Sequence, residues 1–174
     1  MRLGATDVHY PADGGARAAL VVASDRRFER IVEEHVCWLP AAATYVPGNF
    51  ASRELPAILA VLAKANPVDI IFIDGYVDLD PTGRPGLGAR LHERMSTPVV
   101  GVAKSRFRTA THAQAVQRAG TARPLFVTAV GMAVDEAARI VAGMAGAHRI
   151  PDALGRVDAL ARERIRPTVT RERG

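Results

Sequence analysis

Three acidic side chains have the type and the local setting needed to bind a hard divalent cation. Asp7 lies in an apolar opening segment, Glu54 stands at the start of an amphipathic segment, and Asp74 ends an apolar run. Mg²⁺ prefers oxygen ligands and usually takes one or two carboxylates together with phosphate oxygens of a substrate. A metal held in this way lowers the pKa of an attacking water and neutralises charge on phosphoryl oxygens. If the fold brings the three acids together, they predict metal-assisted chemistry at a phosphate.

Each acid also has a simpler role open to it. An Asp after a buried strand is often a turn residue, and a Glu in the first turn of a helix complements the helix dipole. Three adjacent carboxylates, however, repel one another unless a cation offsets their charge, which favours metal binding. Cys37 is the only cysteine and the five histidines show no i, i+4 spacing, so oxygen ligands are expected.

The first 39 residues are predicted to form three antiparallel strands that carry the first acid. Residues 18–23 are apolar and β-branched and follow the turn residues 11–15, so they should pair as a hairpin with the segment around Asp7. Residues 30–39 mix apolar and polar side chains, which indicates a third strand with polar positions toward solvent.

A helix and a βαβ unit are predicted to follow and to carry the other two acids. Ser52 is the predicted N-cap of a helix in which Glu54 flanks the apolar stripe. That stripe has the spacing i, i+3, i+4, i+7, at Leu55, Ile58, Leu59 and Leu62. Residues 68–73, apart from Asp69, and residues 98–103 are apolar runs with too little alternation for a half-exposed strand, as interior parallel strands are. A helical stretch over 86–95 separates them, which predicts a βαβ unit.

The remaining residues predict one more strand over 124–130 and a last helix over 134–144. Three antiparallel strands followed by parallel strands, with helices packed on the sheet, define an α/β protein with a mixed sheet of the ribonuclease H-like fold. We predict one domain over residues 1–160 and a basic C-terminal tail over 161–174.

Charge is distributed unevenly along the chain. Residues 1–87 carry 8 Lys and Arg against 11 Asp and Glu, a net of −3, whereas residues 88–174 carry 15 against 7, a net of +8. Of the 23 cations 21 are arginines, whose guanidinium groups match phosphate geometry. A compositional bias toward Arg and Ala would explain the Arg-to-Lys ratio, but it explains the asymmetry less readily. The charge pattern therefore predicts a polyanionic partner.

Composition excludes several classes of protein. Apolar residues make up 48% and charged residues 24% of the 174 residues, which excludes collagen-like, disulfide-scaffold and wholly disordered chains. No apolar run approaches the 18 residues of a membrane span, and the opening residues lack the apolar region of a signal peptide. A cytoplasmic protein without a membrane partner is expected.

Blocks of sequence across most of the chain resemble the endonuclease V family, metal-dependent nucleases that recognise deaminated purines, chiefly hypoxanthine, in DNA or RNA. The blocks are Asp-Val-His-Tyr at 7–10, Tyr-Val-Pro-Gly at 45–48, Arg-Glu-Leu-Pro-Ala-Ile at 53–58, Ile-Asp-Gly at 73–75, Gly-Val-Ala-Lys at 101–104, Pro-Leu-Phe-Val at 124–127 and Arg-Ile-Pro at 149–151. The most specific of these blocks are the two neighbouring ones at 45–48 and 53–58 and the one at 101–104.

The resemblance implies a Mg²⁺-dependent endonuclease, with Mn²⁺ as an alternative metal, that acts on DNA or RNA. Asp7, Glu54 and Asp74 match the metal-binding acids of the family. Lys104 matches the lysine near the scissile phosphate, where a cation would offset charge in the transition state. These four residues are the expected catalytic set.

The resemblance also implies a nucleic-acid-binding set. Tyr45 lies in the loop that acts in the family as a wedge, where its ring would stack at the place of a displaced base. Pro47 and Gly48 shape that loop, and Gly75 belongs with Lys104 to the part that contacts nucleic acid. For Tyr45, the simpler role is to cover the entrance of the helix.

Five positions depart from the family pattern. Tyr76 and Val77 replace small and polar positions of the pocket for the flipped base, and Asp80 stands where a histidine is usual, so that it could become an additional ligand. Met132 replaces an active-site histidine and can neither transfer a proton nor bind a hard cation well. Arg90 also stands where histidine is common. The departures leave three alternatives: a slower nuclease, a nuclease with altered base preference, or a relative that binds nucleic acid or another partner without cutting.

Overall fold

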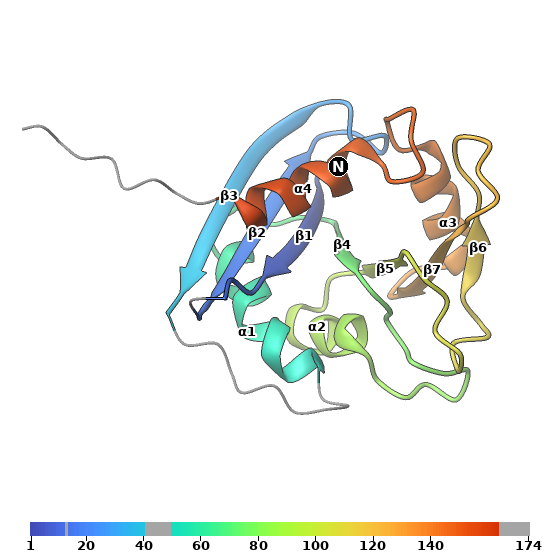
Figure 1. Ribbon diagram of the computed structural model, residues 1–174, viewed down its shortest axis with the longest axis horizontal. Coiled ribbons are helices and arrows are strands. Elements are labelled where there is room, and N and C mark those ends of the chain that lie inside the picture. Colours follow the sequence, from blue (N-terminus) through green and yellow to red (C-terminus); the bar gives the residue numbers. More distant parts are fainter. Residues whose placement is uncertain (13, 41–49, 164–174) are drawn as a thin grey trace, which may run out of the picture.

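The opening residues form three antiparallel strands, β1 (Leu3–His9), β2 (Ala16–Ala23) and β3 (Ile31–Leu39) (Figure 1). The structure is a computed structural model that describes residues 1–12, 14–40 and 50–163. Helix α1 (Phe50–Leu62) then leads to β4 (Ile70–Asp74), and α2 (Leu87–Met95) leads to β5 (Val99–Ala103). β4 lies parallel to both β1 and β5, as predicted for buried apolar strands.

The C-terminal part adds two strands and two helices. β6 (Gln114–Val116) and β7 (Leu125–Val130) are antiparallel to each other, and β7 is antiparallel to β5. They complete a seven-stranded sheet in the order β3-β2-β1-β4-β5-β7-β6. Helices α3 (Val134–Gly143) and α4 (Asp152–Arg162) follow. The predicted mixed sheet of ribonuclease H-like type is thus confirmed.

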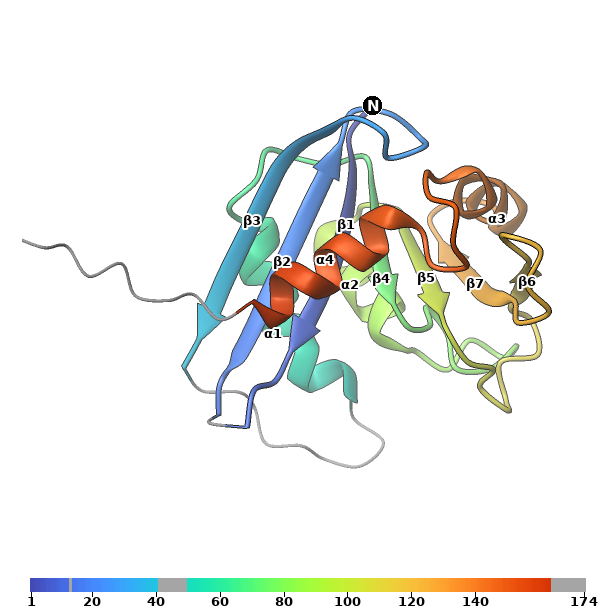
Figure 2. The same ribbon diagram turned by 45° about the horizontal axis from the view of Figure 1, so that its top comes forward.

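Helices cover both faces of the sheet and create two apolar cores. α1 and α2 bury Ile58, Val61 and Leu91 against one face, and α3 and α4 bury Val141 and Val157 against the other. Figure 2 shows α4 lying across β1 and β2, the strands against which it packs. Among the described residues, no helix combines the length and the apolar character needed to span a membrane.

The structure differs from the predicted elements at three places. α1 begins at Phe50, so Ser52 lies inside the first turn and is not the N-cap. The short strand β6 and the helix α4 were not predicted. The predicted tail boundary at 160 cuts through α4, because this helix ends at Arg162 and Ala161 is fully buried. Residues 164–174 lie outside the described part of the chain.

The close approach of β5 to the loop after β4 depends on Gly101. A Cβ there would lie 2.6 Å from the Gly75 carbonyl oxygen, 2.7 Å from the Thr128 Oγ1 and 2.9 Å from the Val77 nitrogen. Because two of these atoms are backbone atoms, Gly101→Ala should lower the Tm by about 4 to 10 °C in a thermal melt. Gly155→Ala, in open space on α4, is the control and should raise the Tm by about 1 to 3 °C. Equal melting of wild type and Gly101→Ala would contradict this close packing.

Candidate metal and nucleic-acid site

The carboxyl ends of two neighbouring parallel strands carry two of the predicted acids. Thr6 of β1 is in register with Ile73 of β4, so the next residues, Asp7 and Asp74, lie at the same edge of the sheet. Glu54 reaches this edge from α1. All three predicted acids therefore line one pocket, here called the acidic pocket. Its lining residues are Asp7, Val8, Glu54, Asp74, Gly75, Lys104, Asp158 and Arg162.

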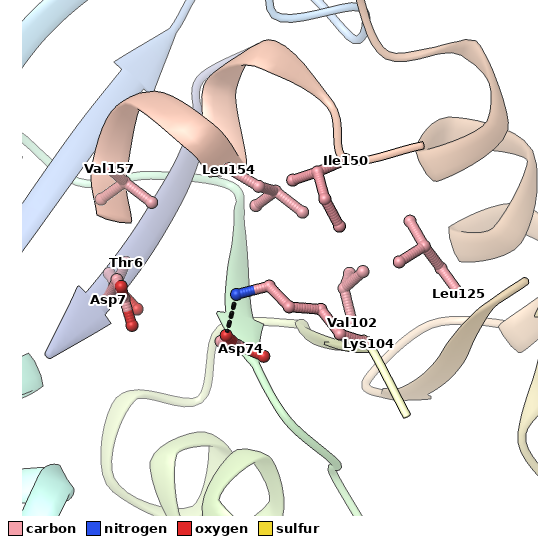
Figure 3. A pocket seen from close by; sticks show the side chains of 9 residues that line it. All are labelled: Thr6, Asp7, Asp74, Val102, Lys104, Leu125, Ile150, Leu154 and Val157. Carbon is pink, nitrogen blue, oxygen red and sulfur yellow. Dashed lines mark hydrogen bonds and ion pairs between the residues drawn. The ribbon is translucent and has the colours of Figure 1, made fainter. Parts of the chain in front are cut away.

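Lys104 lies at the acidic pocket and binds one of its acids. It follows β5, and its Nζ donates a hydrogen bond to the Asp74 Oδ2 at 2.6 Å (Figure 3). Burial lowers the pKa of the ammonium group, but the hydrogen bond and charge of Asp74 outweigh it and raise the pKa overall. The aliphatic stem lines an adjoining apolar pocket with Val102 and Leu154, so the charged end is directed to the acids.

A fourth acid, Asp158, joins the acidic pocket from α4. Its carboxyl group forms a hydrogen bond with that of Asp7. One turn later, the Arg162 Nε donates to both Asp158 oxygens, at 2.9 and 3.0 Å. Burial acts to raise the pKa of Asp158, but the hydrogen bonds with Arg162 and Asp7 lower it overall. The lowered pKa favours the ionised form of Asp158, which lines the same pocket as Asp7.

The sequence contained a sign of this helix that the predictions missed. Ala153, Val157 and Leu160 are buried at i, i+4 and i+7, the spacing of one helix face. Asp158 follows Val157 directly and so lies at the margin of this apolar face. The basic character of residues 161–174 predicts a tail instead.

The acids of the pocket raise one another's pKa values. Burial raises the pKa of Asp7 to about 7, and its hydrogen bond with Asp158 and the charge of Asp74 add to the rise. Burial likewise raises the pKa of Glu54 to about 8, with the charges of Asp7 and Asp74 adding to it. Two carboxyl groups therefore hold protons near neutral pH, because burial and neighbouring negative charges disfavour their ionised forms.

The donor set of the acidic pocket fits a hard divalent cation chemically. All its acidic donors are carboxylate oxygens, and a bound cation would reverse the mutual repulsion that raises the pKa values of Asp7 and Glu54. Within residues 1–12, 14–40 and 50–163, however, no three His, Cys, Asp or Glu side chains are already arranged as a metal-binding group. Lys104 forms an ion pair with Asp74, and Arg162 forms one with Asp158. Metal binding therefore requires these side chains to rearrange.

Gly75 and Asp80, both predicted to belong to the site, have different positions. Gly75 lines the acidic pocket with a φ of 122°, a conformation that favours glycine. Asp80 does not line it. The Asp80 Oδ1 accepts hydrogen bonds from the backbone N–H groups of Thr82 and Arg84 at 3.0 and 3.2 Å, and its other oxygen pairs with the Arg84 guanidinium. Asp80 thus stabilises its own turn, and the structure gives no support to its role as an additional ligand.

The two replacements expected in the base pocket have structural roles. The Tyr76 hydroxyl donates to the Ser105 carbonyl at 2.8 Å and accepts from the Phe107 N–H at 2.9 Å. It therefore joins the loop after β4 to the loop after β5. Val77 is fully buried in the core that α1 and α2 cover.

The other departures from the family pattern lie away from the acidic pocket. Met132 is half-buried and packs against the core that α3 and α4 cover. Arg90 is exposed on α2. Neither lines the acidic pocket. Tyr45, Pro47 and Gly48 lie outside the described residues.

Comparison with known proteins gives consistent matches to one family. The family model for endonuclease V matches residues 1–141, a range that ends before α4. Endonuclease V of Azotobacter vinelandii is 34% identical over 120 residues, which cover 68% of this chain and 53% of the relative. Endonuclease V of Streptomyces coelicolor is 32% identical over 192 aligned positions, covering 98% of this chain and 82% of the relative. The chain spans about half the length of the first curated relatives that it matches.

Solved structures with the same fold come from bacteria and animals. The crystal structure of endonuclease V from Streptomyces avermitilis superposes with a TM-score of 0.80 at 30% identity, covering 93% of this chain and 80% of that one. Endonuclease V of Ciona intestinalis, in complex with a DNA that contains an inosine, superposes with a TM-score of 0.79 at 22% identity, covering 92% and 84%. At this lower identity the likeness concerns the fold alone.

Proposed function

This chain belongs to the endonuclease V family, and we propose that it is a divalent-metal-dependent endonuclease that cuts a phosphodiester bond near a deaminated purine in DNA or RNA. One observation carries the proposal: three acids from different elements, Asp7, Glu54 and Asp74, line one pocket together with Lys104. Carboxylates that bind a divalent cation, beside a basic side chain, can support metal-assisted hydrolysis of a phosphodiester.

The four acids and Lys104 of the acidic pocket each have a proposed role. Asp7, Glu54 and Asp74 would hold Mg²⁺ or Mn²⁺, and Asp158 would extend this carboxylate set from α4. When bound, the metal supplies a water of lowered pKa and neutralises charge on the phosphate. Lys104, already at the pocket, would contact the scissile phosphate and offset negative charge in the transition state.

The substrate class rests on charge and on the relatives. Residues 88–174 carry a net charge of +8, which suits a polyanion. The Ciona relative was crystallised with inosine-containing DNA, which supports a deaminated purine as the target. Tyr45, with Pro47 and Gly48, would supply base stacking beside the pocket. We assign this activity to the domain that α4 completes at Arg162, with a basic segment after it.

A second candidate function is nucleic-acid binding without cleavage. The buried Val77 and the loop-joining Tyr76 favour it, because these side chains replace those that the family places around the flipped base. The absence of a ready-made metal-binding group among the described residues favours it as well.

A gel assay separates the two candidates. Purified protein is incubated with end-labelled DNA and RNA strands that carry one inosine or one adenosine, in Mg²⁺, Mn²⁺ or EDTA. Cutting near inosine that EDTA abolishes supports the nuclease. Binding without cutting, weakened by salt alike for all strands, supports the second candidate. Protein that neither binds nor cuts would overturn both.

A further inference from the structure

Among the described residues, two cations pair with carboxylates at the acidic pocket, and one of them, Lys104, already has a proposed role. The other cation is Arg162, in the last turn of α4. We propose that Arg162 is a phosphate-binding residue that rests on Asp158 in the metal-free protein and is released to the nucleic acid when a divalent cation takes Asp158. This inference rests on the proposed function and adds a residue and a coupling between metal and substrate.

The position of Arg162 supports direct contact with a bound phosphate. It lines the same pocket as Asp74 and Lys104, and its side chain is 60% exposed, so it can be reached from solvent. The Nε already binds two carboxylate oxygens. The planar guanidinium binds the oxygens of phosphate in the same bidentate manner.

The carboxylate that Arg162 holds is the one that a metal would compete for. Asp158 and Asp7 line the same pocket, so a cation bound at Asp7 lies within reach of Asp158 as well. A divalent ion attracts these oxygens more strongly than a guanidinium does, since its charge is twofold and concentrated. An exposed i, i+4 pair contributes little to stability, so the exchange is easily made.

The same helix provides a matched control. Arg156 also binds both oxygens of a carboxylate, that of Glu34, at 2.8 and 2.8 Å. Its side chain is 46% exposed, but it does not line the acidic pocket. Replacing Arg156 removes the same charge from the same helix without removing it from the pocket.

The first test is metal binding without nucleic acid. Mn²⁺ is titrated into wild type, Arg162→Gln and Arg156→Gln, and free Mn²⁺ is followed by its electron paramagnetic resonance signal. Arg162→Gln should bind Mn²⁺ about 3- to 10-fold more tightly, because no guanidinium has to be displaced from Asp158 and a nearby positive charge is gone. Arg156→Gln should match wild type. Thermal melts within about 2 °C of wild type would show that each variant is folded.

The second test is the coupling between metal and nucleic acid. A labelled single-stranded 20-mer with one inosine is bound in EDTA and in Ca²⁺, which takes the same oxygen ligands. Ca²⁺ should raise the affinity of wild type about 3- to 10-fold more than that of Arg162→Gln. The slope of log affinity against log salt should be shallower by about 0.7 for Arg162→Gln, in Ca²⁺ only. Arg162→Lys should keep most of the gain.

The outcomes separate this inference from the proposed function. Mn²⁺ affinity that is unchanged or weaker in Arg162→Gln, or an equal Ca²⁺ effect on DNA binding in both proteins, would overturn the inference alone if wild type cuts DNA. A wild-type protein that binds no Mn²⁺ would overturn both.

Discussion

Replacing Asp74 with asparagine should lower metal-dependent cleavage by about 10²- to 10³-fold or more, with the protein still folded. Asp74 is a proposed metal ligand and also accepts a hydrogen bond from the Lys104 Nζ at 2.6 Å. One substitution therefore removes a metal ligand and also loosens Lys104, the side chain proposed to contact the scissile phosphate. The amide keeps the size of the side chain but lacks the charge. The measurement is single-turnover cleavage of an inosine-containing strand in Mg²⁺ and in Mn²⁺.

Asp80→Asn is the matched control for this experiment. It removes a carboxylate from the loop that follows β4, but Asp80 stabilises its own turn and does not line the acidic pocket. The cleavage rate of Asp80→Asn should stay within about threefold of wild type, because Asp80 does not contribute to the acidic pocket. If Asp74→Asn cuts at the wild-type rate, the proposed metal site is in the wrong place.

In the metal-free protein, Glu54→Gln should increase stability at alkaline pH although it removes a proposed ligand. In the folded protein Glu54 keeps its proton up to about pH 8, whereas in the unfolded chain it ionises near its ordinary pKa of 4.5. The folded state therefore binds an extra proton between these values, and the stability of wild type falls as pH rises from about 5 to 8. Glutamine is never charged, so the variant escapes this loss.

The expected size of this effect can be measured by thermal melts in EDTA. Glu54→Gln should melt about 4 to 8 °C above wild type at pH 8.5 and close to wild type at pH 5. Glu34→Gln is the contrasting control: Arg156 lowers the pKa of Glu34 through their hydrogen bond, so this substitution should not stabilise at either pH. A Glu54→Gln variant that melts below wild type at pH 8.5 would contradict the proposed crowding of acids.

In the acidic pocket, the arrangement of carboxylates that would bind a metal lowers the stability of the metal-free protein. The carboxylates that would hold a metal raise one another's pKa values when no metal is present. Lys104 and Arg162 partly relieve the repulsion by pairing with Asp74 and Asp158. Active sites commonly show such a conflict between stability and activity.

Local patterns in the sequence were enough to predict most of the sheet and three of its site residues. The apolar runs that became β4 and β5 have the composition of buried parallel strands, and the spacing in α1 gives a helix with Glu54 near the sheet. The parallel pairing of β1 with β4 in the structure then places Asp7 and Asp74 at the same edge of the sheet. These features depend on a few neighbouring residues and on general rules of strand connection.

The acidic pocket as a whole was decided by tertiary structure. Asp158 and Arg162 reach it because α4 folds back across β1, about 150 residues earlier in the chain, and an apolar helix face does not specify which strands it covers. The same holds for Val77, whose burial depends on the helix and strands that enclose it. The raised pKa values of Asp7 and Glu54 likewise follow from burial and from acidic neighbours that other elements bring close. The sequence by itself determined which residues could do the chemistry, because residue type and periodicity are local; the tertiary structure alone decided their partners, because contacts between distant segments depend on the packing of the whole chain.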